Sequence, residues 1–363
     1  MTHVYEKVIT PSTGLRLHLN ENTAGCSPKV LEALQAITRQ QAAFYPDYDL
    51  ARAATASRLG VRTDELVLTN GLDEGILAAA VAALRAIGQI LIGPSFESEA
   101  RPSRSDPEAI VVVPAFEMYA VCIDAAGGRV VKVPLNNDFS FPLNLVRDAI
   151  RPNTRLIFLT NPNNPTGQCI PRQEILDIVR ATPHALVFVD EAYADFAGQT
   201  LIDDAEARSL PNLVIGRTFA KAYGLAGLRA GAVVGHPETL APLGRVVPPF
   251  SLNIYAATAL TAGLGDTEYY EWYLGQVRES KALLYRALDG LGLRYWRSAA
   301  NFVLVELGKD VDRLVDALAA RQVFVRNRSR DHACAGCVRV TTGVVADTQA
   351  FVNALEEVLC GAA

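Results

Sequence analysis

Between residues 65 and 235, short runs rich in β-branched and aliphatic residues alternate with longer stretches of helix-forming composition. The runs that we interpret as strands are Leu66–Thr69, Ile90–Ile92, Ile110–Val113, Val130–Val133, Leu156–Leu159, Leu186–Val189, Leu213–Ile215 and Ala232–Val234. Strands that alternate with helices predict an α/β fold with a mostly parallel central sheet and helices on both faces. Ligands of such sheets bind beyond the carboxyl ends of the strands. The residues that directly follow each run are therefore the first candidates for a functional site.

The remainder of the chain has a different pattern and indicates a second unit. A helical stretch over residues 261–293, broken near Gly263 and Gly265, is followed by short strands at 302–305, 323–325 and 338–340 and by helices at 310–320 and 346–359. We predict three parts: an N-terminal arm with one helix (1–42), a large domain (43–250) and a small α+β domain (251–363). A chain of 363 residues is long enough to bury two cores.

Charge, apolar runs and cysteines exclude several classes of protein. The net charge of −5 indicates no basic face, so we expect neither a nucleic-acid nor a membrane partner. No apolar run reaches about 18 residues, and the N-terminus lacks the pattern of a signal peptide. Scattered cysteines indicate reduced thiols and a cytoplasmic protein. Cys334 and Cys337 have only His332 nearby, short of the four ligands of a structural zinc, so we expect no metal.

Polar residues of distinct chemistry follow three of the predicted strands. Asn70-Gly-Leu-Asp73-Glu74 precedes an apolar helix, where free N–H groups and the helix dipole favour a phosphate; an ordinary strand-to-helix turn is an equal alternative. Asp190 ends a run that reads as fully buried, so its carboxylate needs a cationic or hydrogen-bonding partner. Lys221 is flanked by small and apolar residues, and a desolvated lysine can attack an aldehyde. Taken alone, such a lysine is more often a surface residue with a buried stem.

One cofactor requires all of these groups at one edge of a sheet. Pyridoxal phosphate needs a lysine for its aldehyde, a carboxylate at its ring nitrogen and an anion site for its phosphate. It also needs a donor at its ring hydroxyl, which explains the stiff corner at residues 161–167, where Asn164 would meet that hydroxyl. We expect the Asn164–Pro165 peptide to be cis, because cis proline fixes such corners.

With these motifs in this order, the chain resembles the fold type I aminotransferases, and within them the histidinol-phosphate aminotransferase group, nearly from end to end. The matching motifs are Leu19-Asn-Glu-Asn22 with Ser27-Pro28, Tyr45-Pro-Asp47, Asn70 to Glu74, Asn161 to Gly167, Asp190-Glu-Ala-Tyr193, Lys221 to Gly231, Asn301-Phe302, Val325-Arg326 and Cys337 to Gly343. One such motif is weak evidence, whereas the ordered set is specific.

The resemblance implies a role for each matched residue. Lys221 would bond the aldehyde of pyridoxal phosphate in a ping-pong Schiff-base mechanism and move the substrate's proton. The ring would be held by Asp190 at its nitrogen, by Tyr193 and Asn164 at its hydroxyl and by Phe116 on its face. The phosphate would be bound by Leu72 and Asp73 through their backbone, by Thr218 and Arg229, and by Tyr45 of a second subunit. The implied catalytic residues are Lys221, Asp190 and Tyr193, and the active unit is a homodimer with shared sites.

The same resemblance implies the substrates. Arg339 and Arg326 would grip an anionic group, with Asn22 and Asn164 beside them. The expected reaction exchanges an amino donor and a keto acceptor: histidinol phosphate and 2-oxoglutarate give imidazole acetol phosphate and glutamate.

Several residues depart from the usual pattern of the group: Thr23, Phe116, Glu117 and Ala220, all near the cofactor or the substrate entrance. They leave three alternatives open. One is another amino-acid aminotransferase, aromatic or from secondary metabolism. Another is an enzyme like threonine-phosphate decarboxylase. The last is a non-catalytic module that senses the cofactor, which would need a DNA-binding domain, and the sequence before residue 19 offers little room for one.

Overall fold

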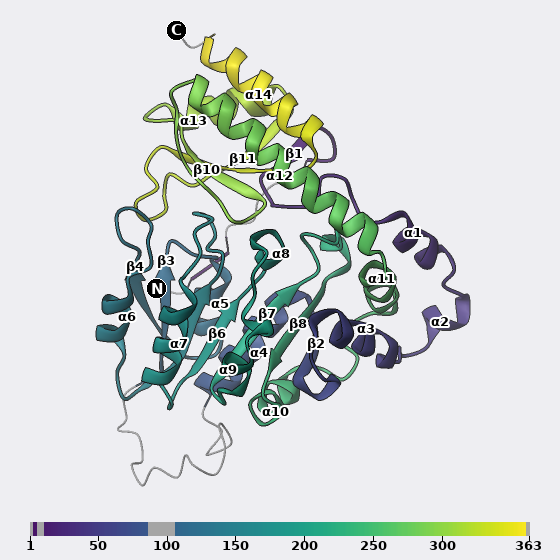
Figure 1. Cartoon of the computed structure of the whole chain (residues 1–363). Helices are drawn as coiled ribbons and strands as arrows, with labels where there is room; N and C mark the ends of the chain where they lie inside the picture. The colour runs from purple at the N-terminus through teal and green to yellow at the C-terminus, as the bar shows by residue number, and fades with distance from the viewer. Residues whose placement is uncertain (1–2, 6–10, 86–105, 361–363) are drawn as a thin grey trace.

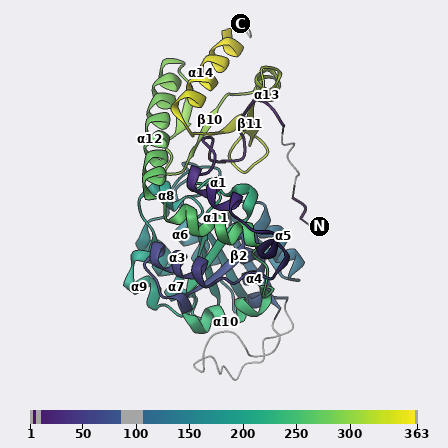
Figure 2. The same cartoon turned by 90° about the vertical axis from the view of Figure 1, so that its right-hand side faces the viewer.

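The computed structural model describes residues 3–5, 11–85 and 106–360, which fold around two β-sheets. In Figure 1 the larger sheet and its helices form the lower tier, and the smaller sheet, with the green and yellow helices α12 to α14, forms the upper tier. Figure 2, turned by 90°, shows the same two tiers, so the stacking does not depend on the viewpoint. The predicted strand at Ile90–Ile92 lies outside the described residues.

The larger sheet has seven strands in the order β2-β8-β7-β6-β5-β3-β4. Their bounds are β2 Leu66–Asn70, β3 Glu108–Val113, β4 Arg129–Pro134, β5 Thr154–Thr160, β6 Leu186–Asp190, β7 Leu213–Thr218 and β8 Ala230–Gly235. Neighbours pair in parallel except at β8, which is antiparallel to both β2 and β7. Since two reversals restore the direction, β2 runs the same way as β7. The prediction of a mostly parallel sheet is confirmed.

Successive residues of the central strands enter two apolar cores on opposite faces of this sheet. In β6, Val187 and Val189 belong to one core, and Leu186 and Phe188 to the other, as the two-residue period of a strand requires. The first core includes residues of α1 Pro28–Gln35, α3 Asp49–Leu59, α6 Leu143–Ala149, α7 Arg172–Ala181, α9 Ala205–Ser209 and α11 Ile254–Leu264. The second includes residues of α4 Gly71–Leu84, α5 Met118–Ala125 and α10 Pro237–Val246. Burial on both faces explains why these strands read as continuous apolar runs.

The smaller sheet has the order β1-β11-β12-β10-β9 and packs against three helices. Its strands are β1 Leu15–Leu17, β9 Arg294–Trp296, β10 Phe302–Glu306, β11 Val323–Asn327 and β12 Cys337–Thr341, and its helices are α12 Thr267–Gly290, α13 Val311–Ala320 and α14 Val345–Cys360. β1 pairs in parallel with β11, so the N-terminal arm adds an edge strand to this sheet. The division into 1–42, 43–250 and 251–363 stays a prediction.

The N-terminal arm has two helices where we expected one within residues 1–42. The structure has α1, which ends at Gln35, and a separate α2 at Arg39–Ala43. Thr38 lies between them in an extended conformation, and its side chain accepts a hydrogen bond from the Gln41 backbone while the Thr38 backbone N–H donates one to the Gln41 side chain. Because this capping box satisfies free N–H groups at the first turn of α2, a second helix begins here and α1 does not continue.

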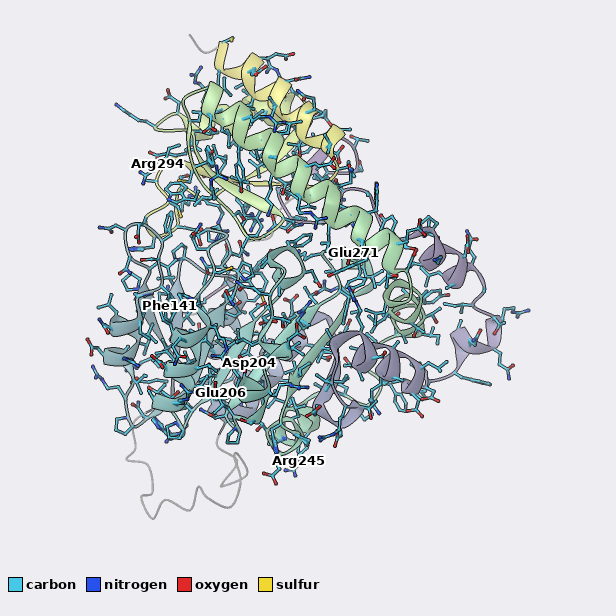
Figure 3. All side chains as sticks on the ribbon, viewed as in Figure 1. Phe141, Asp204, Glu206, Arg245, Glu271 and Arg294 are labelled. Atoms are coloured by element: carbon cyan, nitrogen blue, oxygen red, sulfur yellow. The ribbon has the colours of Figure 1, made fainter. Side chains whose placement is uncertain are left out.

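Shorter elements and exposed charges complete the fold. Among the described residues the remaining helices are α8 Ala194–Ala197 and the 3-10 turns η1 Thr63–Glu65, η3 Leu201–Asp203 and η4 Ala226–Leu228. Charged residues such as Arg245, Glu271 and Arg294 lie on the outside (Figure 3). In the described ranges no helix combines the length and the apolar character that crossing a membrane requires.

Candidate active site

A cavity of about 360 Å³ lies at the carboxyl edge of the larger sheet and is also lined by residues of the N-terminal arm and the smaller sheet. Most of the predicted site residues line it: Leu72, Asp73, Phe116, Asn164, Asp190, Tyr193, Thr218, Lys221, Arg229, Arg326 and Arg339. Strand direction explains the convergence. β2, β3, β5, β6 and β7 end at this edge, whereas β8 starts there, so residues after five strands and before a sixth share one site.

Asp190 is the last residue of β6 and is 4% exposed. Tyr119 donates a 2.6 Å hydrogen bond to its Oδ2, and the Ala192 backbone N–H donates one of 2.9 Å to its Oδ1. Burial raises the pKa of Asp190 to about 6, against the lowering effect of these donors. In this buried position, a nearby cation would stabilise the ionised form of the carboxylate further than the neutral donors do.

Lys221 lies in the turn between β7 and β8, surrounded in sequence by the buried residues Ala220 and Ala222. Its Nζ donates a 3.0 Å hydrogen bond to the carbonyl oxygen of Leu19 from the N-terminal arm. Loss of hydration, with a smaller contribution from Arg339, lowers the pKa of Lys221 to about 8. This lysine is therefore a far better nucleophile and base near neutral pH than an exposed one.

The turn from β2 into α4 forms an anion corner with Arg229. Gly71 has φ +71°, and a Cβ there would lie 2.5 Å from Nη2 of Arg229, so only glycine leaves room for the guanidinium. That Nη2 donates a 2.8 Å hydrogen bond to Oδ2 of Asp73. The first turn of the 14-residue α4 supplies backbone N–H groups at Leu72 and Asp73 beside the same arginine.

The corner after β5 is fixed by its own asparagines. Asn163 donates from Nδ2 to the Thr166 hydroxyl at 3.0 Å, and Oδ1 of Asn161 accepts from the Ile170 backbone at 2.9 Å. The Asn164–Pro165 peptide is cis, as predicted, and the peptides at Pro162 and Pro114 are cis as well. The corner thus holds Asn164 at the cavity wall.

Asn164 and Tyr193 are both engaged by neighbours from other parts of the chain. Oδ1 of Asn164 accepts a 2.5 Å hydrogen bond from Nη1 of Arg339, whose Nη2 donates to the His18 carbonyl at 2.6 Å. The Tyr193 hydroxyl accepts from Nδ2 of Asn20 at 3.0 Å. Phe116, at the cavity wall, meets the Tyr119 ring edge to face, with centroids 5.8 Å apart.

Two predicted site residues do not line the cavity. The Asn22 side chain donates to the Ala222 carbonyl and accepts from the Ala24 backbone, both at 3.0 Å. Tyr45 is 79% exposed and stacks on Phe250, with ring centroids 4.3 Å apart. Their roles in substrate binding and in a second subunit's site stay predictions.

The sequence interpretation missed three residues of the site: Tyr119, Asn20 and Arg328, which line the cavity. Tyr119 follows Phe116 by one helical turn, a spacing that places both on one face and that could have identified it. Arg328 follows Arg326 by two residues, the period of a strand. Glu117 contacts both of these arginines through Oε1, at 3.5 Å from Arg326 and 3.4 Å from Arg328.

These residues fit pyridoxal phosphate. The buried carboxylate of Asp190 suits a protonated ring nitrogen, and the corner at Gly71, into which a Cβ would project, suits a phosphate against Arg229. Lys221, with its lowered pKa, suits the aldehyde. In the described parts of the chain no group of three potential metal ligands occurs.

Comparison with known proteins also indicates an enzyme that uses pyridoxal phosphate. The family model of aminotransferase class I and II matches residues 12–355. The chain is 35% identical to a histidinol-phosphate aminotransferase of Moorella thermoacetica, covering 95% of this chain and 85% of the relative, and 35% identical to histidinol-phosphate aminotransferase 2 of Carboxydothermus hydrogenoformans, covering 95% and 91%. Its fold matches the histidinol-phosphate aminotransferase of Sinorhizobium meliloti in complex with pyridoxal-5'-phosphate, with a TM-score of 0.81 and 26% identity over 96% of this chain and 92% of that one. The chain belongs to the class I and II aminotransferases and is a pyridoxal-phosphate-dependent transaminase of fold type I.

Proposed function

We propose that this transaminase transfers the amino group of histidinol phosphate to 2-oxoglutarate, giving imidazole acetol phosphate and glutamate. The observation that carries the proposal is the basic wall of the cavity, where Arg326, Arg328 and Arg339 all face the space beside Lys221. A phosphate monoester is the strongest match for several guanidinium groups. The names of the curated relatives support the same substrate.

Bound pyridoxal phosphate supplies an aldehyde that exchanges amino partners and a ring that accepts the electron pair left when a proton leaves the substrate carbon. Lys221 supplies the base. Its Nζ takes a proton from the α-carbon of the amino donor and returns a proton to the α-carbon that becomes that of the product amine. With a pKa of about 8, roughly a tenth of this amine is neutral at pH 7, far more than for an ordinary lysine.

Asp190 holds the proton on the ring nitrogen. With a pKa of about 6 it is mostly ionised at pH 7, and a facing cation favours the ionised form further. Tyr119 positions this carboxylate through its 2.6 Å hydrogen bond. Tyr193 and Asn164 would hold the ring hydroxyl, and Phe116 would pack on the face of the ring.

The anion corner anchors the cofactor. Arg229, Thr218 and the N–H groups of Leu72 and Asp73 would hold its phosphate; Nη2 of Arg229 donates to Asp73 in the same corner. Arg339 and Arg326 would bind the substrate with Asn164 beside them, and Asn22, which does not line the cavity, is proposed as a further substrate residue.

The active unit that we propose is a homodimer in which Tyr45 completes the phosphate site of the neighbouring subunit. Support comes from large exposed apolar side chains on α2, α3, α11 and the segments beside them: Phe44, Tyr45, Leu50, Phe250 and Tyr255. Such a group marks an interaction surface. Mixing Tyr45→Phe subunits with Lys221→Ala subunits should restore activity, because one site of each heterodimer is intact. A monomer in light scattering at assay concentration would refute the dimer.

We also propose a cytoplasmic location, which is supported by the cysteines at positions 26, 122, 169, 334, 337 and 360, all free thiols.

Substrate preference tests the proposed function directly. We expect kcat/KM for histidinol phosphate to exceed that for phenylalanine, tyrosine and histidinol by at least about tenfold, which corresponds to about 1.4 kcal/mol. A smaller preference would remove histidinol phosphate as the substrate and leave only the transaminase. Release of carbon dioxide from threonine phosphate would instead indicate a decarboxylase.

A further inference from the structure

The arginines of the basic wall are placed next to one another on one sheet face, which bears on how they divide the work of binding the substrate. Arg326 of β11 pairs directly with Arg339 of β12. The ladder continues one step further, because the Arg328 N–H donates a 2.9 Å hydrogen bond to the Cys337 carbonyl. Arg326 and Arg328 are two residues apart and therefore share a face, while Val325, the neighbour of Arg326 in β11, faces the apolar core.

This arrangement destabilises the sheet unless anions offset it, since like charges opposite one another repel. Arg328 is 7% exposed, so solvent screens it little. Asp331, with Oδ2 2.5 Å from Nε of Arg328, forms an ion pair behind the guanidinium. On the cavity side, Nη1 of Arg328 contacts Glu117. One edge of the Arg328 guanidinium is thus fixed by the protein, and the other is directed at a residue that lines the cavity.

The contacts of Glu117 are those of an exchangeable counterion. One oxygen, Oε1, is shared by Arg326 and Arg328 at 3.5 and 3.4 Å, well beyond the 2.7–2.9 Å or so of a strong charge-assisted hydrogen bond. The Glu117 side chain is 32% exposed, so it can turn to solvent without a large cost. Arg339, by contrast, already donates from both Nη atoms to Asn164 and His18.

We propose that Arg326 and Arg328 form the clamp for the phosphate of the amino substrate, and that Glu117 occupies this clamp until the phosphate displaces it. Arg328 is then a substrate ligand and Glu117 a specificity-determining residue. A dianion compensates two guanidinium groups better than one carboxylate oxygen does, so the exchange favours phosphate over a neutral group. The inference rests on the proposed function, because it assigns the phosphate of histidinol phosphate to this clamp.

The first experiment compares the holoenzyme with three variants: Arg328→Gln, Glu117→Gln and the control Arg330→Gln. Arg330 is exposed in the same turn, so its variant changes the net charge equally. Calorimetric titration with inorganic phosphate should show binding about tenfold weaker in Arg328→Gln, about tenfold tighter in Glu117→Gln and unchanged in Arg330→Gln. Equal affinity in Arg328→Gln and the control, or weaker binding in Glu117→Gln, would overturn the proposal.

Steady-state kinetics separate a ligand from a merely structural residue. For Arg328→Gln, KM for histidinol phosphate should rise at least about tenfold while kcat stays within about twofold, and histidinol, which lacks the phosphate, should be unaffected. Arg328→Lys, which keeps the positive charge but loses the bidentate geometry of the guanidinium, should give an intermediate KM. An equal loss for both substrates would show that Arg328 only supports the fold.

Failure of the proposed function gives a different pattern. If the wild-type enzyme does not prefer histidinol phosphate to phenylalanine, tyrosine and histidinol by at least about tenfold, the substrate assignment is wrong. The clamp is then tested by comparing KM for glutamate with KM for glutamine. If Arg328→Gln raises KM for glutamate alone, the clamp is retained as a carboxylate site. If it raises neither KM, the clamp is excluded.

Discussion

Gly71→Ala tests whether the turn into α4 is built to bring Arg229 against a phosphate. The substitution has two effects that can be separated. First, alanine must adopt φ +71°, which costs about 1–2 kcal/mol in any left-handed position. Second, its Cβ would lie 2.5 Å from Nη2 of Arg229, so the guanidinium must leave the corner.

A matched control isolates the second effect. Gly60 has φ +65°, and a Cβ at this position would meet nothing within 4 Å, so Gly60→Ala carries the backbone cost alone. Both variants should lose about 1–2 kcal/mol of unfolding free energy in urea titrations. Only Gly71→Ala should also lose a charge-assisted contact to phosphate, worth about 1.5–3 kcal/mol, or roughly ten- to a hundredfold in Kd.

The assay is the binding of pyridoxamine 5'-phosphate to cofactor-free protein, which avoids the bond to Lys221. Gly71→Ala should weaken this binding, and Gly60→Ala should leave it unchanged. Pyridoxamine without the phosphate should bind both variants and the wild type alike. If Gly71→Ala bound the phosphorylated ligand as well as the control does, the phosphate would not be held by Arg229 in this corner.

Three further predictions concern the catalytic groups. Tyr119→Phe removes a donor that lowers the pKa of Asp190, so carboxyl-carbon NMR of the cofactor-free variant should place this pKa above about 6; an unchanged titration would contradict the role of Tyr119. Lys221, labelled by reductive methylation with ¹³C-formaldehyde, should titrate near pH 8, with the neutral amine predominating above that pH; a midpoint near 10 would show that the site does not desolvate it. Lys221→Ala should lose transamination by several orders of magnitude and still bind pyridoxamine 5'-phosphate, and near-wild-type turnover would exclude Lys221 as the base.

The sequence by itself determined the elements whose causes are local. The buried strands of the large sheet were predictable because an apolar run such as Leu186–Val189 can only be covered on both faces. Asn161 to Gly167 indicated a rigid corner, since proline fixes φ and asparagine side chains hydrogen-bond to the nearby backbone. The order of the motifs identified the family, because that order does not depend on the path of the chain.

The tertiary structure alone decided which distant residues meet. Glu117 and Arg328 are 211 positions apart, and no local rule shows that one carboxylate oxygen would lie between Arg326 and Arg328. Likewise, no local rule shows that Leu15–Leu17 would pair with β11 or that the Leu19 carbonyl would accept a hydrogen bond from Lys221. Strand period and helix period fix which face of an element a side chain occupies. What that face contacts depends on long-range packing, and the cavity of this protein is lined by residues from Tyr5 to Arg339.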